Sequence, residues 1–145
     1  MEPIRIKKLK PNAVVPTYGS PEAAGADLYA CLDECVSIPA GKTVFIPTGI
    51  AMEVPKGCAG LIYARSSMGA KRGLAPANKV GVIDSDYRGQ VMVALHNHSQ
   101  EEQVVQPGER IAQLLITPVF TPGFREVDDL TDTERGTGGF GSTGR

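Results

Sequence analysis

Glycine and proline break this chain into short apolar runs along its whole length. The sequence contains 17 Gly and 11 Pro, which form turn groups such as 39–41, 55–57 and 107–108. Because both residues interrupt helices and favour turns, short apolar runs between them are typical of strands. Several strands at roughly ten-residue spacing predict an all-β subunit, built as an antiparallel barrel or sandwich.

The apolar runs also indicate where the strands lie. Ile4 and Ile6 alternate with polar residues in segment 4–9, so we expect both to face inward. Segment 109–120 is predicted to form one long strand. The other expected strands cover 36–38, 43–50, 51–54, 58–64, 90–95 and 103–105, and residues 11–21 are expected to form a loop.

Composition limits the classes of function. At 145 residues the chain is long enough for one domain and too short for two ordinary ones. Its formal net charge of −1 argues against binding nucleic acid through bulk electrostatics. The N-terminus lacks the apolar stretch of a signal peptide, and no apolar run approaches membrane-spanning length. We therefore expect a soluble chain that binds neither a membrane nor nucleic acid.

Cysteine usage predicts a reducing compartment. Cys31, Cys35 and Cys58 are an odd set without a secretion signal, which indicates reduced thiols in the cytoplasm. A zinc site with His96 and His98 is disfavoured, because neither pair has zinc-finger spacing. Buried or half-buried thiols are the expectation, and whether Cys31 and Cys35 pair stays open.

The segment 81–89, Gly-Val-Ile-Asp-Ser-Asp-Tyr-Arg-Gly, carries two carboxylates two positions apart. On a strand this spacing places Asp84 and Asp86 on the same side. The Asp-Ser-Asp tract and the closing glycine predict a hairpin bend, with 82–83 and 91–95 as its two apolar strands. A bend that presents an acid, an aromatic ring and an arginine is a candidate catalytic platform, although Asp-rich bends are also common as solvated turns.

A cation, two hydroxyls and a glycine follow an apolar strand in segment 64–69, Ala-Arg-Ser-Ser-Met-Gly. Ser66 or Ser67 is expected to cap a short helix over 68–71. The N–H groups at such a helix start bind anions, and Arg65 would add a charged contact. The plain alternative is a helix cap without a ligand.

Two other polar positions, Asp27 and Asn78, have two interpretations each. Asp27 either begins a tightly packed strand or braces an arginine. Asn78 either recognises the edge of a base or satisfies backbone groups in a loop. Arg110 and Gln113 are three positions apart, so on a regular strand they face opposite sides, and at most one shares the side of Asp27.

The last segment, 124–145, changes from acidic to glycine-rich. From position 135 it reads Arg-Gly-Thr-Gly-Gly-Phe-Gly-Ser-Thr-Gly-Arg, without the lysine of a P-loop. Either it folds over an anionic ligand with its backbone N–H groups, hydroxyls, Arg135 and Phe140, or it is a disordered glycine tail. The aromatic ring among the glycines favours the first interpretation.

Five segments in order resemble the motifs of the homotrimeric dUTP diphosphatase (dUTPase) family, namely 24–30, 64–69, 81–89, 108–114 and 135–144. One such motif would be weak evidence, but five at family-like spacing over nearly the whole chain are specific. The related dCTP deaminases share an Arg-Ser-Ser segment, yet they resemble the chain much less in the bend and in the tail.

The resemblance implies a distorted jelly-roll or β-barrel subunit in 1–134 and a glycine-rich arm in 135–145. It implies a homotrimer with active sites shared between subunits. The implied reaction converts dUTP and water to dUMP and pyrophosphate by attack on the α-phosphorus, which keeps uracil out of DNA and supplies dUMP for thymidylate synthesis. Mg²⁺ would be the cofactor, held by the substrate triphosphate with no direct protein ligand.

The resemblance also assigns roles to residues. Asp84 would hold and deprotonate the attacking water, and Asp27 would support the site. Tyr87 would lie under the sugar and exclude a 2′-hydroxyl, and Phe140 would stack on the uracil. The residues expected to bind substrate are Arg65, Ser66, Ser67, Asn78, Gly81, Tyr87, Gln113, Arg135, Phe140, Gly141, Ser142 and Thr143.

Other classes of protein give different expectations. A dCTP deaminase, alone or bifunctional, would release ammonia from dCTP. A binding or regulatory module with the same fold would act through protein partners. A purely structural β-protein would leave the clustering of Arg65, Asp84 and Phe140 unexplained.

Overall fold

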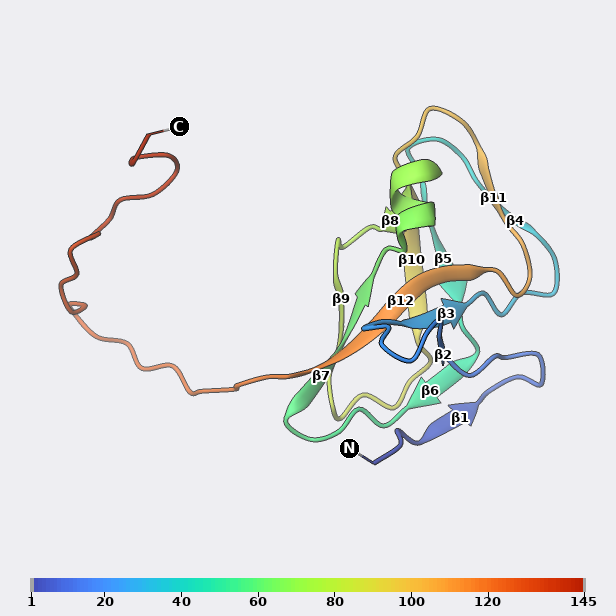
Figure 1. The fold of residues 1–145 in the computed structure, drawn as a ribbon, viewed down its shortest axis with the longest axis horizontal. Coiled ribbons are helices and arrows are strands. Elements are labelled where there is room, and N and C mark those ends of the chain that lie inside the picture. The colour runs from blue at the N-terminus through green and yellow to red at the C-terminus, as the bar shows by residue number, and fades with distance from the viewer. Residues whose placement is uncertain (1, 145) are drawn as a thin grey trace.

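The computed structural model describes residues 2–144, and nearly all of its regular structure is β-strand (Figure 1). In chain order the elements are β1 (Ile6–Lys8), β2 (Thr17–Tyr18), β3 (Ala26–Tyr29), β4 (Val36–Ile38), β5 (Thr43–Pro47), β6 (Ile50–Met52), β7 (Cys58–Tyr63), the π-helical turn η1 (Ser67–Lys71), β8 (Leu74–Pro76), β9 (Gly81–Ile83), β10 (Met92–Asn97), β11 (Gln103–Val105) and β12 (Arg110–Pro118). The all-β prediction is confirmed, although β2 lies inside the expected loop 11–21. Among the described residues, no helix is long and apolar enough to cross a membrane.

The strands of residues 2–144 form four sheets. The largest has the order β2-β3-β12-β7-β9, and the second has the order β5-β10-β8, while β1 pairs with β6 and β4 pairs with β11. In the described part of the chain the outer strands of the largest sheet, β2 and β9, do not pair, so the sheet stays open. The barrel alternative is therefore wrong, because outer strands of two and three residues are too short to give the stagger that closure requires.

The core lies between the sheets and is built by in–out alternation along the strands. In β10, Val93 and Leu95 are buried, whereas Met92 and Ala94 are more exposed, as expected for a strand with one face on the core. The largest fully buried apolar side chains include Leu28, Ile38, Ile46, Ile50, Leu74, Leu95 and Ile111. Burying each of them stabilises the fold by about 1.5–3 kcal/mol relative to leaving it exposed.

The predicted strand 43–50 is broken at Gly49, so β5 ends at Pro47 and β6 begins at Ile50. Gly49 has a φ of +68°, which disfavours residues with a side chain. A Cβ at this position would also lie 2.6 Å from the Sγ of Cys31. The predicted strand boundary between positions 50 and 51 is therefore wrong, since the backbone turns at 48–49 to pass from one sheet to another.

The bend at 84–91 connects two sheets rather than the two strands of one hairpin (Figure 1). β9 pairs with β7, where Ile83 lies opposite Gly60, whereas β10 pairs with β5, where Val93 lies opposite Ile46. The predicted hairpin is wrong. Ile83 and Val93 are buried against separate long-range partners, and this packing outweighs the local turn signal.

Beyond β12 the chain leaves the body and runs outward as an extended segment, here called the arm, residues 120–144 (Figure 1). The N–H of Val119 still donates to the carbonyl of Gly57 at 2.9 Å. Further along, the backbone hydrogen bonds within 133–144 close local turns, such as the N–H of Gly138 to the carbonyl of Arg135 at 3.1 Å. The departure from the body thus begins before position 135, where the glycine-rich arm was expected to start.

Candidate active site

Asp27 on β3 lies between two arginines from distant parts of the chain. Its Oδ1 accepts a hydrogen bond from Arg65 Nε at 2.8 Å, and its Oδ2 accepts one from Arg110 Nη1 at 3.3 Å. Asp27 is only 8% exposed, so these opposite charges offset the desolvation of its carboxylate. The interpretation that Asp27 braces an arginine is confirmed.

A β-bulge in β12 brings Arg110, Gln113 and Asp27 to one side of the sheet. Gln113 lies directly opposite Asp27 in the β3–β12 pairing, and residues paired across antiparallel strands share a face. The register shifts between Arg110 and Ala112, which inserts one extra residue and reverses the alternation before Gln113. The prediction that at most one of Arg110 and Gln113 shares the side of Asp27 is therefore wrong, because it assumed a regular strand.

The segment after β7 leads into η1 through backbone contacts rather than a serine cap. The N–H groups of Met68 and Gly69 donate to the carbonyl of Arg65 at 3.0 and 2.8 Å. Ser66 is the N-cap residue, but it has a helical φ of −56° and its side chain makes no capping hydrogen bond. The predicted serine cap is wrong. The hydroxyls of Ser66 and Ser67 are therefore exposed and do not cap η1. The Oγ of Ser67 accepts a hydrogen bond from Arg65 Nη1 at 3.2 Å.

Gln113 holds the start of this segment against β12. Its Nε2 donates to the carbonyl of Ala64 at 2.9 Å. Gly25, on the approach to β3, leaves room for the Gln113 side chain, because a Cβ there would lie 2.5 Å from Gln113 Oε1. Residues from three of the motif segments, 24–30, 64–69 and 108–114, therefore form one cluster around Asp27.

A second cluster surrounds a groove of about 370 Å³ beside β9. Four residues expected from the sequence line it, namely Asn78, Gly81, Asp84 and Tyr87. The rest of the lining is largely apolar. Polar groups at the edge of an apolar groove are typical of sites that bind flat organic ligands.

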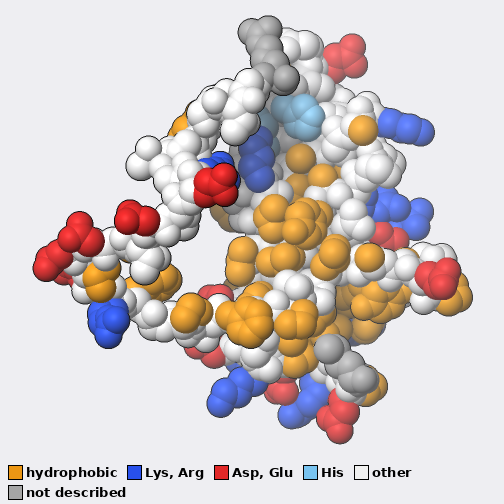
Figure 2. Space-filling view, turned by 60° about the vertical axis from the view of Figure 1, so that its left-hand side comes forward, with side chains coloured by type: hydrophobic (Ala, Val, Ile, Leu, Met, Phe, Trp, Pro, Cys, Tyr) orange, Lys and Arg blue, Asp and Glu red, His pale blue; other side chains and the backbone are white. Residues whose placement is uncertain are grey.

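Phe45 and Met92 also line this groove, and the sequence did not identify them as site residues. Phe45 on β5 is 67% exposed and Met92 on β10 is 38% exposed. The β5–β10 pairing places Phe45 opposite Ala94, two residues from Met92, so both side chains lie on the outer face of that sheet. The available signal was the in–out alternation of β5 and β10, which turns these two apolar side chains outward. Figure 2 shows hydrophobic side chains gathered over one face of the body.

The bend itself fixes the orientation of Tyr87. The Oη of Tyr87 donates to the carbonyl of Gln90 at 2.9 Å, and its N–H donates to the carbonyl of Asp84 at 3.2 Å. Gly89 packs under the ring, because a Cβ there would lie 2.4 Å from Tyr87 Oη. Asp84 is exposed, and no hydrogen bond within residues 2–144 occupies its carboxylate. The bend therefore fixes the orientation of the Tyr87 ring and leaves the Asp84 carboxylate exposed beside it.

Asp84 and the Asp27 cluster lie toward different ends of β7. Ile83 pairs with Gly60 near the start of β7, whereas Arg65 follows Tyr63 at its end. Tyr63 lies three strand positions beyond Gly60, which corresponds to roughly 10 Å. Within one chain, Asp84 and Arg65 are therefore not brought together.

The expected site residues of the arm lie apart from both clusters (Figure 1). Arg135 Nε donates to the carbonyl of Gly138 at 2.7 Å, which closes a local turn. Phe140 is fully exposed and has a φ of +53°, followed by Gly141 with a φ of +83°. In this chain the arm residues expected to bind substrate, Arg135, Phe140, Gly141, Ser142 and Thr143, therefore do not meet the rest of the site.

Metal-ligating side chains are scattered. In residues 2–144, no group of three or more His, Cys, Asp or Glu is placed to hold a metal ion. The cysteines are free thiols. Cys31 is buried and its Sγ donates to Asn12 Oδ1 at 3.3 Å, whereas the exposed Cys35 donates to Gln106 Oε1 at 3.1 Å.

The two clusters and the arm carry all five motif segments, and the family model described as dUTPase matches residues 11–144. The chain belongs to the dUTPase family. This membership confirms the resemblance drawn from the five segments, and it places both clusters in a dUTPase subunit.

Individual dUTPases are similar over the whole chain. The deoxyuridine 5′-triphosphate nucleotidohydrolase of Pectobacterium carotovorum is 45% identical over 150 residues, covering 100% of this chain and 99% of its own. That of Desulfitobacterium hafniense is 52% identical over 131 residues, covering 90% of this chain and 87% of its own. A mutant dUTPase of Staphylococcus bacteriophage 80alpha, solved with dUpNHpp, matches with a TM-score of 0.90 and 26% identity over 100% of both chains. The predicted fold class, a distorted jelly roll, is confirmed, apart from barrel closure.

Proposed function

We propose that this chain hydrolyses dUTP to dUMP and pyrophosphate by attack of water on the α-phosphorus. The observation that carries the proposal is the groove in which Asn78, Gly81, Asp84 and Tyr87 meet, in a chain of the dUTPase family. This reaction keeps uracil out of DNA and supplies dUMP for thymidylate synthesis. The free thiols of the three cysteines are consistent with a cytoplasmic location.

Asp84 acts as the general base. Its carboxylate is exposed at the groove, directly after β9, and the backbone of the bend is held by the Tyr87 N–H to Asp84 carbonyl bond. An ionised carboxylate accepts hydrogen bonds only, so it orients a water molecule and then takes its proton. General-base catalysis of this kind contributes about 10²–10⁴-fold in rate.

The Asp27 cluster binds the phosphates. Asp27 engages Nε of Arg65, which leaves the outer edge of the guanidinium for phosphate oxygens. Ser66 and Ser67 add exposed hydroxyls beside it, and the amide of Gln113 lies on the same side of the sheet. Asp27 supports this group without contacting substrate.

The groove selects the base and the sugar. The Tyr87 ring lies under the deoxyribose and leaves no space for a 2′-hydroxyl, because the bend holds the ring in place. Asn78 and the backbone at Gly81 pair with the edge of uracil. Cytosine is rejected, since its donor and acceptor are reversed and would leave buried polar groups unpaired.

The end of the arm closes the site. Phe140 stacks on the uracil and excludes bulk water, while Arg135, Ser142 and Thr143 reach the phosphates and Gly141 supplies the backbone freedom for the approach. The positive φ values of Phe140 and Gly141 are consistent with a tight turn in the arm that presents the ring.

Mg²⁺ fits this site as an ion that arrives with the substrate. The described residues offer no set of three metal-ligating side chains, and a chelated Mg²⁺ takes most of its ligands from phosphate and water. When bound, the ion neutralises phosphate charge. The residues of the chain then hold the phosphates and orient the water.

The complete site requires several copies of the chain, and we propose a homotrimer. The separation of Asp84 from Arg65 along β7 supports this assembly, as does the distance of the arm from both clusters (Figure 1). Each site would take Asp84 from one subunit and the arm from another.

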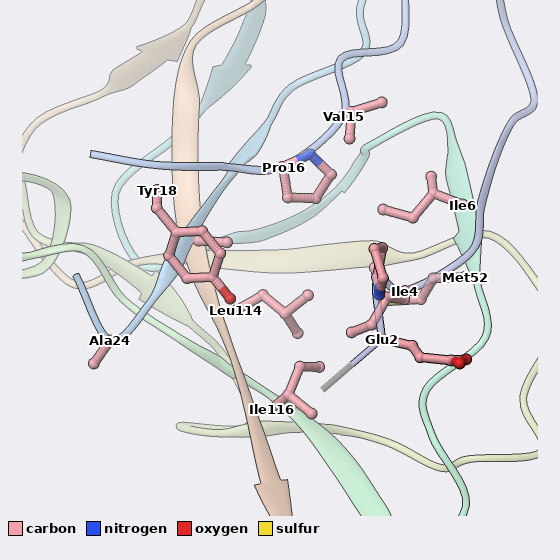
Figure 3. Close-up of a pocket in the computed structure, with 12 residues that line it drawn as sticks. Glu2, Ile4, Ile6, Val15, Pro16, Tyr18, Ala24, Met52, Leu114 and Ile116 are labelled. Carbon is pink, nitrogen blue, oxygen red and sulfur yellow. The ribbon is translucent and has the colours of Figure 1, made fainter. Parts of the chain in front are cut away.

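Unpaired apolar surfaces on the body and the arm support the same assembly. A groove of about 470 Å³ is lined by apolar side chains that include Ile4, Ile6, Val15, Tyr18 and Ile116 (Figure 3). On the arm, Phe120, Phe124 and Leu130 are 97%, 101% and 86% exposed. Apolar surface of this extent favours burial against further copies of the chain.

The test is release of pyrophosphate from dUTP, dCTP, dTTP and UTP in the presence of Mg²⁺, with ammonia measured in parallel. Release from dUTP alone is expected. Ammonia from dCTP would identify a deaminase instead, and a folded protein that releases pyrophosphate from none of the four would be a binding module.

A further inference from the structure

Arg72, which follows η1, joins three parts of the chain through its guanidinium. Its Nη1 forms an ion pair with Glu109, which precedes β12, and contacts Met68 Sδ at 3.4 Å. Its Nη2 donates to the carbonyl of Val104 at 2.6 Å, and its Nε donates to Gln103 Oε1 at 3.4 Å, both on β11. Because all three nitrogens are engaged and the side chain is 29% exposed, Arg72 is held in one orientation rather than moving freely at the surface.

The partner of Arg72 is also fixed. Glu109 Oε2 accepts the N–H of Gln106 at 2.9 Å, and the Glu109 carbonyl accepts the N–H of Ala30 at 2.8 Å. The Glu109 side chain is 23% exposed. Glu109 is thus anchored at the end of β3, directly before Arg110, so Arg72 binds a rigid point next to the Asp27 cluster.

These contacts, together with the peptide bond between Glu109 and Arg110, close a ring, here called the arginine ring, that runs Arg65, Asp27, Arg110, Glu109, Arg72, Met68 and back to Arg65. Its last links are backbone bonds, since the Arg72 N–H donates to the Met68 carbonyl at 3.2 Å and the Met68 N–H donates to the Arg65 carbonyl at 3.0 Å. Three ion pairs contribute to the ring, namely Arg65–Asp27, Arg110–Asp27 and Arg72–Glu109. The ring therefore ties the serine-bearing turn 65–67 to the bulge of β12.

We propose that Arg72 is a positioning residue for the triphosphate, acting through the arginine ring on the turn 65–67. This inference rests on the proposed function and adds a residue that lies outside both clusters. Arg72 fixes η1 against β12, and η1 in turn fixes the backbone of Arg65. Displacement of a binding group by about 1 Å is enough to weaken its contacts severely.

Arg72 should affect binding of the phosphates and leave binding of the base unchanged. No residue of the arginine ring lines the groove that holds Asn78 and Tyr87. Loss of Arg72 should therefore weaken binding of dUTP, while binding of dUMP, which lacks the β- and γ-phosphates, should change little. A general loss of folding would weaken both.

The experiment is steady-state kinetics of the full chain and of the variants Arg72→Gln, Glu109→Gln and the double variant. Each single change is expected to raise KM for dUTP roughly ten-fold with kcat within about two-fold, and the double change to be no worse than either, because the two residues act as a pair. The inhibition constant of dUMP should stay within about two-fold. Lys71→Gln is the matched control, since it removes the same charge from an exposed neighbour for which no ion pair occurs within residues 2–144.

Several results would overturn the inference. They are an unchanged KM for dUTP in Arg72→Gln, an equal rise of this KM in Lys71→Gln, or a rise in the inhibition constant of dUMP that parallels the rise in KM. If Arg72→Gln does not fold, Glu109→Gln, which keeps the side-chain shape, decides alone. A wild-type chain that fails to hydrolyse dUTP overturns the proposed function and this inference together, whereas active wild type with unaffected variants overturns the inference alone.

Discussion

Tyr87 shows how a single glycine fixes a functional side chain. The ring of Tyr87 packs over Gly89, where any Cβ would lie 2.4 Å from Oη and 2.6 Å from Cζ. No flexible end of a side chain can relieve this contact, because the ring itself is held by the hydrogen bond to the Gln90 carbonyl. The glycine that closes the bend is therefore required by packing, in addition to any turn preference.

Gly89→Ala should displace the Tyr87 ring and damage the sugar filter. We expect the ratio of kcat/KM for dUTP over UTP to fall roughly ten-fold, with KM for dUTP rising by a similar factor. Gly19→Ala is the control, because nothing lies within 4 Å of a Cβ at that position. An unchanged dUTP/UTP ratio in a variant with weaker dUTP binding would show that Tyr87 does not read the sugar.

Four residues of the groove could be predicted from sequence, whereas Phe45, Met92 and the long-range contacts of the arginine ring could not. Asn78, Gly81, Asp84 and Tyr87 lie close together in the chain, and the groove brings them together in space. Arg110 reaches Asp27 across 83 positions, and it does so only because of the bulge. Arg72 and Glu109 meet across 37 positions. Nothing local marks such pairs, since their partners are set by strand register.

At the scale of elements, the turn residues predicted where strands begin and end. They were a poorer guide to which strands pair. Glycine and proline divide the chain much as the structure does, and β12 confirms the expected long strand. The bend at 84–91 carries strong turn chemistry, yet its flanking strands belong to different sheets. Turn signals act over a few residues, whereas pairing depends on side chains buried far away in the sequence.

The break between β5 and β6 should be intolerant of any side chain. Gly49→Ala combines a positive φ with a Cβ 2.6 Å from Cys31 Sγ and 2.9 Å from Ala13 Cβ. We expect a loss of about 2–4 kcal/mol in the free energy of unfolding, from left-handed strain and overpacking together. Urea unfolding at fixed protein concentration measures this loss.

Gly41→Ala isolates the backbone contribution. Gly41 has a φ of +73°, and nothing lies within 4 Å of a Cβ there. Its substitution should cost only about 1–2 kcal/mol. If Gly41→Ala and Gly49→Ala lower the free energy of unfolding equally, the close contact with Cys31 adds nothing to the cost of a side chain at position 49.

At the scale of the whole molecule, one chain of the dUTPase family carries all five motif segments without bringing them all together. The groove contains Asp84, the Asp27 cluster begins at the other end of β7, and the arm runs outward from the body (Figure 1). The sequence resemblance predicted a shared site, and the separation within the chain supplies a physical reason for sharing. Assembly would also cover the apolar groove of Figure 3.

Mixing two inactive variants tests this sharing most directly. Asp84→Asn keeps the arm but loses the base, while deletion of residues 136–145 keeps Asp84 but loses Phe140. Each variant alone should assemble into trimers and hydrolyse dUTP at least about 10²-fold more slowly than the wild-type chain. Asp86→Asn, which changes an exposed acid outside the groove lining, should remain active.

The decisive measurement is dUTP hydrolysis by the two variants co-refolded in equal amounts. If Asp84 and the arm come from different subunits, half of the chains supply each part, and activity should recover to about a quarter of the wild-type value. If a single chain supplies both Asp84 and the arm, no mixed site is complete, and the co-refolded trimers should stay as inactive as the separate variants. Recovery would establish the shared dUTPase site, and persistent inactivity in trimers shown to be mixed would contradict it.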